Sequence, residues 1–87
     1  MVKEQVAVNN LTGLHLRPAG VLCREAMNFK CSIQFTFGSY TSNVKSVLSV
    51  LGACVKRGDV ITLICDGEDE EEALRYMVKL IREGLGE

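Results

Sequence analysis

The sequence predicts an α+β fold in which three helices cover one face of a four-stranded antiparallel sheet. Four short segments have the apolar pattern of strands, and three have the residue spacing or the cap residues of helices. They follow one another in the order βαββαβα, which suits one layer of helices packed on one layer of strands. The 87 residues are enough for one core and too few for two, so we expect a single domain over residues 1–87.

The first half of the chain predicts a strand, a helix and a hairpin. Apolar residues alternate in the strands on either side of the helix, and inside the helix they recur every three or four residues. Gly38-Ser39 fits a two-residue hairpin loop with glycine at its first central position. The elements are a strand over residues 2–8, a helix whose apolar pattern runs from Ala19 through Leu22, Cys23, Ala26 and Met27, and strands over residues 32–37 and 40–43.

The second half predicts a short helix, a strand and a long helix. Ser46 is suited to cap the short helix, because its hydroxyl accepts a hydrogen bond from an N–H group that has no partner in the helix. Asp69 and Glu72 have the spacing of a capping box at the start of the long helix. The elements are a helix over residues 47–51, a turn at Gly58, a continuous apolar strand over 60–65 that suits the centre of the sheet, and a helix that ends at Gly84 and buries Ala73, Leu74, Met77, Leu80 and Ile81.

Charge and hydropathy exclude several classes of function. The formal net charge is −1 with acidic and basic residues mixed, so the chain lacks the positive surface with which proteins bind nucleic acid or anionic membranes. No apolar run approaches the roughly 18 residues that a membrane span needs. The N-terminal residues lack the pattern of a signal peptide, and we therefore expect a cytoplasmic protein.

The cysteines do not have the spacing of a metal site. They stand at positions 23, 31, 54 and 65, no two of them form a C-x-x-C pair, and the chain has one histidine. Three of the four fall where the local pattern favours an apolar residue, so we interpret them as reduced thiols in or near the core. The acidic run over residues 68–72 is typical of a solvated helix start. We expect neither a metal nor a cofactor.

The segment from Gly13 to Ala19 has the most distinctive chemistry in the chain. Pro18 favours the first turn of a helix, and this places His15 at or just before the helix start, beside N–H groups without partners. Those groups and the positive end of the helix dipole attract an anion, and imidazole is a good nucleophile near neutral pH. The segment thus predicts an imidazole that carries a phosphoryl group, with Arg17 as the cation beside it. The alternative is an ordinary loop histidine, and Pro18 also disfavours helical angles at Arg17.

The residues Gly13-Leu14-His15-x-Arg17-Pro18-Ala19 resemble the active-site signature of HPr, the histidine-containing phosphocarrier of the bacterial sugar phosphotransferase system. The resemblance covers nearly the whole chain and includes a second motif, Asn43-Val44-Lys45-Ser46-Val47-Leu48. It implies an open-faced sandwich fold. It also implies that His15 accepts a phosphoryl group on Nδ1 from enzyme I and passes it to sugar-specific IIA domains. Such a protein is a carrier and not an enzyme, and a free-standing enzyme finds no support because no second residue forms a catalytic set with the histidine.

The resemblance further implies a docking patch around the histidine. Its members are Leu16, Gly20, Val47, Leu48 and Leu51. The alternative places them all in the core, but a short helix with four apolar residues in five cannot bury every one. Leu16, Gly20, Cys23 and the pair Ala53-Cys54 depart from the family's usual residues, which leaves His15, Arg17 and Ser46 unaffected but puts the choice of partners in doubt.

Ser46 supports a second hypothesis. In HPr of many Gram-positive bacteria a dedicated kinase, HPr kinase/phosphorylase, modifies the corresponding serine, and the modified form assists a catabolite repressor. The resemblance therefore implies regulatory phosphorylation at Ser46, which is compatible with its role as a cap. The alternative function is a mainly regulatory protein acting through phosphorylated Ser46; the presence of His15 with Arg17 argues against it. We expect a monomer, because a shuttle exposes one patch to many partners.

Overall fold

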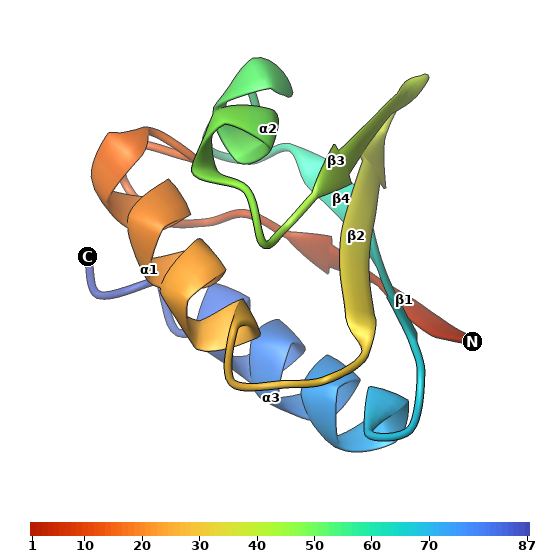
Figure 1. The fold of residues 1–87 in the computed structure, drawn as a ribbon. Coiled ribbons are helices and arrows are strands. Elements are labelled where there is room, and N and C mark those ends of the chain that lie inside the picture. Colours follow the sequence, from red (N-terminus) through yellow and green to blue (C-terminus); the bar gives the residue numbers. More distant parts are fainter.

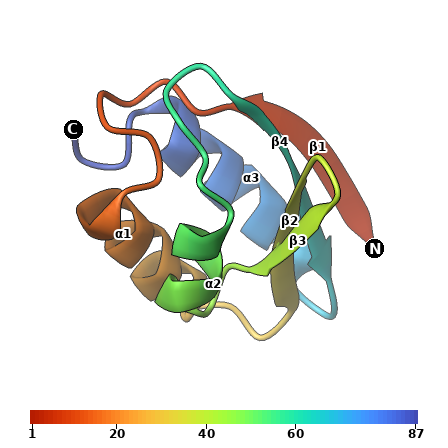
Figure 2. The ribbon, with the colours of Figure 1, turned by 90° about the horizontal axis from the view of Figure 1, so that it is seen from above.

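The computed structural model describes all 87 residues and confirms the predicted order of elements (Figure 1). Three helices lie on one side of a single four-stranded sheet, as the view from above also shows (Figure 2). The α+β prediction is therefore confirmed. The elements are β1 (Val2–Ala7), α1 (Leu16–Ala26), β2 (Ser32–Phe37), β3 (Tyr40–Asn43), α2 (Val47–Gly52), β4 (Val60–Asp66) and α3 (Glu70–Arg82).

The sheet has the strand order β1-β4-β2-β3, and all neighbouring strands are antiparallel. The apolar strand β4 lies in the interior of the sheet, where β1 pairs with one edge and β2 with the other, as its sequence predicts. The two-residue loop Gly38-Ser39 joins β2 to β3, with Phe37 paired to Tyr40. Gly38 has a φ of +60° and Ser39 is not in the left-handed region, which agrees with the predicted loop.

The core lies between the sheet and the helices. Alternate residues of β2 and β4 point toward the helices, because successive side chains of a strand face opposite sides of the sheet. The opposite face has polar residues such as Gln34 of β2 and Thr62 of β4 together with the half-buried Ile64, and no helix covers it (Figure 1). The core members of these two strands are Ile33, Phe35, Ile61, Leu63 and Cys65, all at most 1% exposed.

Helix α1 begins at Leu16 with Pro18 in its first turn, as predicted, because the N–H that proline lacks has no partner there. Two details of the helices differ from the predictions. Met27, predicted on the apolar face, follows the end of α1 and is 61% exposed. In α3, Val78 is buried, whereas Leu74 and Leu80 are half-buried at the margins of the stripe.

The predicted capping box of α3 is wrong. Asp69 is the N-cap residue, but its side chain makes no cap hydrogen bond. Its carboxylate instead accepts hydrogen bonds from the backbone N–H groups of Lys30 and Cys31, at 2.8 and 2.9 Å. These two residues lie between α1 and β2, so Asp69 holds a distant segment that no local pattern reveals. The bond from Lys30 is the main reason that the pKa of Asp69 lies below its ordinary value.

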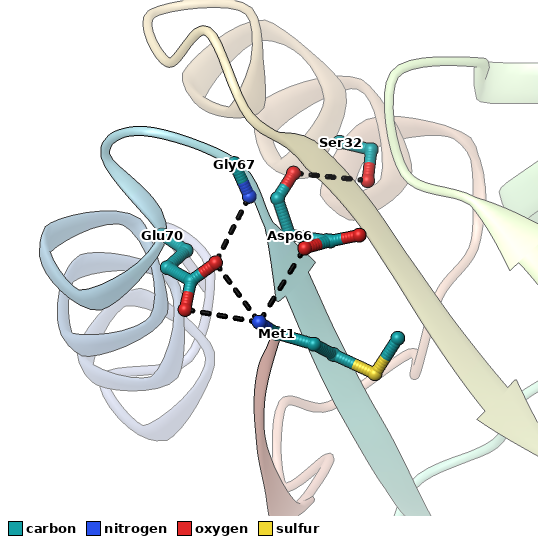
Figure 3. Close-up of polar contacts among 5 residues, drawn as sticks. All are labelled: Met1, Ser32, Asp66, Gly67 and Glu70. Carbon is teal, nitrogen blue, oxygen red and sulfur yellow. Dashed lines mark hydrogen bonds and ion pairs between the residues drawn. The ribbon is translucent and has the colours of Figure 1, made fainter.

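The carboxylate of Glu70 binds the N-terminal amino group and the turn between β4 and α3 (Figure 3). It accepts a hydrogen bond from the Gly67 N–H at 3.0 Å and binds the Met1 amino group at 3.1 Å. The Asp66 carboxylate lies 3.4 Å from the same amino group. The two acidic residues Asp69 and Glu70 therefore have protein partners, which accounts for part of the acidic run at the start of α3.

The lowered pKa of Asp69 leads to a pH prediction. A carboxyl group with a lower pKa in the folded state stabilises the fold above its unfolded pKa of about 3.9, and this contribution is lost as the pH falls through the folded pKa. We therefore expect Asp69→Asn to lower the urea midpoint at pH 7 and to reduce the loss of stability in acid. Glu68→Gln, at an exposed residue without a hydrogen bond, is the control. An Asp69→Asn variant with the wild-type pH dependence would contradict the assignment.

Candidate functional site

His15 is the N-cap residue of α1, as the sequence predicts. Its backbone is extended, with φ −74° and ψ −175°, and its carbonyl accepts the hydrogen bond of the Ala19 N–H at 2.8 Å. The side chain is exposed and makes no cap hydrogen bond. The imidazole is therefore free to react at the surface, beside the first turn of the helix.

The start of α1 has no acidic residue of its own, although the Glu87 carboxylate lies close enough to interact with the Arg17 charge. The first turn of α3, by contrast, contains three acidic residues. The N–H groups of Leu16 and Arg17 belong to the first helical positions, which have no acceptor within the helix. These donors and the helix dipole therefore remain available to an external anion next to His15.

Arg17 lies in the same first turn and is exposed. Its guanidinium forms no ion pair with any side chain of the protein. The pKa of Glu87 lies below its ordinary value mainly because Asn10 and Thr12 donate hydrogen bonds to its carboxylate, and the positive charge of Arg17 lowers it further. A guanidinium has donors in a forked arrangement that matches the oxygens of a phosphate.

A cleft of about 420 Å³ opens beside the histidine. It lies between the start of α1 and the segment that follows α2, and five of its seven lining residues are apolar. Leu16 and Leu51, two members of the predicted patch, share this cleft with His15. The complete lining is Leu14, His15, Leu16, Leu51, Cys54, Val55 and Lys56.

The other three members of the predicted patch, Gly20, Val47 and Leu48, do not line the cleft. Leu48 is 81% exposed on α2, and Leu16 is 70% exposed, so neither is a core residue. Val50 is the buried residue of α2, while Val47 and Leu51 are half-buried. A Cβ added at Gly20 would meet no atom within 4 Å, which shows that open space adjoins α1 at this residue.

Sequence reasoning missed Leu14, Val55 and Lys56 as neighbours of the histidine. The N–H of Leu14 donates to the Val55 carbonyl at 3.0 Å, and this contact joins two segments far apart in the chain. Cys54 was predicted only as a reduced thiol and as a departure from the family's usual residues. It has a φ of +55°, the left-handed conformation common just after a helix, and no residue pattern signals the bend there, because glycine or asparagine usually occupies such a position.

Ser46 caps α2 as predicted. Its hydroxyl accepts a hydrogen bond from the Ser49 N–H at 3.3 Å. The Ser49 hydroxyl in turn accepts from the Asn43 N–H at 2.9 Å, so the cap is tied to β3. Ser46 is half-buried and stands two residues before the exposed Leu48.

The side chains with metal-ligand chemistry are dispersed. No group of three His, Cys, Asp or Glu side chains is placed to hold a metal ion. Cys31 and Cys65 are buried, Cys23 is half-buried and Cys54 is exposed, and all four are free thiols. Burial raises the pKa of Cys65 to about 12, so its thiol is inert near neutral pH. None of the three helices combines the length and the apolar composition needed to cross a membrane.

Comparison with known proteins gives a consistent result. The family model described as "PTS HPr component phosphorylation site" matches residues 2–83. The phosphocarrier protein HPr of Lysinibacillus sphaericus is 35% identical over 83 residues, which cover 95% of this chain and 94% of that protein. The HPr-like protein Crh of Bacillus subtilis (strain 168) is also 35% identical over 83 residues, covering 95% of this chain and 98% of that protein.

Solved structures agree with the sequence relatives. An HPr from Thermoanaerobacter tengcongensis has a TM-score of 0.96 at 34% identity, over 100% of this chain and 98% of that one. A crystal structure of Bacillus subtilis Crh, described as a domain-swapped dimer, has a TM-score of 0.78 at 35% identity over 95% of both chains. The match of the family model, the sequence identities and the shared fold together show that this chain belongs to the HPr family of phosphocarrier proteins of the phosphotransferase system.

Proposed function

We propose that His15 accepts a phosphoryl group from enzyme I and passes it to sugar-specific IIA domains. The observation that carries this proposal is an exposed imidazole at a helix start that has free N–H groups, no acidic residue and an unpaired arginine. HPr-family proteins are carriers and not catalysts. Such a carrier works in the cytoplasm, where the partners are, and its one domain spans residues 1–87.

The energetics of the site suit reversible transfer. Phosphoryl transfer depends mainly on the position of the group and on the stabilisation of its spread negative charge. The helix start contributes roughly 0.3–2 kcal/mol to binding an anion, and the Arg17 guanidinium adds charge-assisted hydrogen bonds. These contributions favour the phosphorylated imidazole without making it too stable to pass the group on.

The apolar residues around His15 are proposed to form the docking surface. Leu16 and Leu51 border the cleft, Leu48 is the most exposed apolar side chain on α2, and Val47 and Gly20 lie on the same two helices. Apolar groups at the centre of an interface contribute most when they become desolvated. Partner enzymes of the phosphotransferase system each cover this surface in turn.

Leu48→Glu tests the docking surface. We expect it to weaken binding to enzyme I by roughly tenfold or more, because a charged group would be buried where an apolar one fits. The fold should be unaffected, because Leu48 is 81% exposed. Titration calorimetry measures the affinity, and Met27→Glu, at an exposed residue at the far end of α1, is the matched control. An unchanged affinity would remove Leu48 from the interface.

The second candidate function is regulation through Ser46. The cap position of Ser46, two residues from Leu48, and the similarity to Crh favour it. A phosphoryl group there adds a charge of about −1.5 to −2 at pH 7, which would alter the docking surface and favour a different partner, a catabolite repressor. HPr kinase/phosphorylase is the enzyme proposed to add it.

One labelling experiment separates the two functions. The chain is incubated with enzyme I and labelled phosphoenolpyruvate, or with HPr kinase and labelled ATP, and each product is then treated with acid. Label on His15 is lost in acid, whereas label on Ser46 survives. Acid-labile label with enzyme I supports the carrier function, and acid-stable label with the kinase supports the regulatory one. The absence of both would refute both proposals.

We propose that the carrier is a monomer. A monomer leaves the docking surface free for each partner, but a solved relative, Crh of Bacillus subtilis, is described as a dimer. A monomer is therefore not a general property of proteins with this fold. We keep the monomer as the proposed form of the carrier, and sedimentation at working concentration tests it.

A further inference from the structure

The segment after α3 folds back onto the loop that leads to His15. Gly84, Leu85 and Gly86 all have positive φ angles, of +94°, +53° and +84°. Such a conformation is unfavourable for leucine, which has a Cβ. Two contacts hold Leu85 in place: its side chain is 1% exposed in the core, and its N–H donates to the Leu80 carbonyl at 3.2 Å. The result is a tight curl that directs Glu87 toward the start of the chain.

The Glu87 carboxylate binds this loop through several donors. Oε1 accepts hydrogen bonds from Asn10 Nδ2 at 2.8 Å, from the Thr12 N–H at 3.1 Å and from Thr12 Oγ1 at 2.9 Å. Oε2 also lies 2.9 Å from Thr12 Oγ1. Asn10, which is 4% exposed, donates as well to the Gly13 carbonyl at 2.7 Å. One carboxylate thus joins Asn10 and Thr12 within the loop over residues 10–13.

This loop determines where His15 lies. It connects β1 to α1 without regular structure, and Thr12 is three residues before His15. On its other side, the Leu14 N–H is bonded to the Val55 carbonyl. The loop is therefore held between the segment after α2 and the Glu87 carboxylate. Among the side chains of the protein, Glu87 alone accepts a hydrogen bond from Thr12.

We propose that Glu87 is a positioning residue for the reaction of His15, because its carboxylate fixes the loop from which the imidazole projects. This inference rests on the proposed carrier function. Phosphoryl transfer requires the attacking and leaving atoms to be in line, and a small misplacement of a reacting group slows such a reaction strongly. A loosened loop would spread the imidazole over several positions and so lower the rate of phosphoryl uptake.

Three variants test the inference. Glu87→Ala removes all the acceptors, and we expect kcat/KM for phosphoryl uptake from enzyme I to fall roughly tenfold, mainly through kcat. Glu87→Gln keeps a carbonyl oxygen for Asn10 and the Thr12 N–H but removes the charge, and we expect it to restore most of the rate. Glu83→Ala, at an exposed residue next to the same curl, is the matched control with wild-type rates.

The results distinguish positioning from other roles. Glu87→Ala at the wild-type rate would overturn the proposal, and so would an equal loss in Glu87→Gln, which would indicate that charge and not position matters. If the wild-type chain itself takes up no phosphoryl group, the proposed function fails. NMR then tests separately whether the Glu87 carboxylate fixes the loop over residues 10–13. Faster hydrogen exchange at the Thr12 amide and broadened His15 ring signals in Glu87→Ala would support this role of Glu87, and unchanged signals would overturn it.

Discussion

His15→Ala is expected to abolish phosphoryl uptake from enzyme I. The reason is chemical, because alanine has no atom that forms a bond to phosphorus, and the chain has no second histidine to replace the first. Incubation with enzyme I and labelled phosphoenolpyruvate, followed by separation of the protein from free label, measures the effect. Uptake of acid-labile label by this variant would place the phosphorylated residue elsewhere.

The fold of this variant provides its control. The His15 side chain is exposed and forms no cap hydrogen bond, while the contact that starts α1 runs from its backbone carbonyl to the Ala19 N–H. That contact is kept in alanine. Circular dichroism and the melting temperature of His15→Ala should therefore match those of the wild type. A large loss of stability would show that the imidazole has a structural role that the geometry does not include.

Gly13→Ala is expected to destabilise the protein by about 2–4 kcal/mol, because two costs add. Gly13 has a φ of +67°, a conformation that residues with a Cβ rarely adopt. A Cβ there would also lie 2.6 Å from the Val55 carbonyl oxygen and 2.8 Å from the Lys56 Cα. Both are backbone atoms, so no side chain can move aside to relieve the contact, and the Leu14 bond to Val55 would be disturbed.

Urea unfolding measures this effect, and Gly20→Ala is its matched control. A Cβ at Gly20 meets no atom within 4 Å, and the residue lies inside α1. Alanine there should stabilise the protein by about 0.5–1 kcal/mol, because it is the better helix former. Equal stability of Gly13→Ala and the wild type would show that the backbone over residues 54–57 can move to accommodate the Cβ. The loop over residues 10–13 would then be less rigid than its contacts indicate.

Much of the fold follows from local signals in the sequence. The alternation of Ile33 and Phe35, the glycine at position 38 and the hydroxyl of Ser46 each act within a few residues of their own position. The same holds for the start of α1, where Pro18 and the residues around it predict an exposed histidine at a helix terminus. Each of these predictions was correct because the interactions that decide it span one turn or one hairpin.

The remainder depends on contacts between distant segments, which no local pattern encodes. Asp69 has the spacing of a capping residue, yet its carboxylate binds Lys30 and Cys31, because the backbone donors there lie within reach only after the sheet and helices have packed. The cleft beside His15 likewise forms only where the segment after α2 meets the start of α1.

The residue pattern alone predicts the elements, their order and an imidazole at a helix start. The strand order, the lining of the cleft and the hydrogen bonds from the loop over residues 10–13 to Glu87 depend on the tertiary structure. The physical reason is distance along the chain: a cap or a turn is specified by neighbouring residues, whereas Glu87 and Thr12, 75 residues apart, meet only through the packing of the whole core.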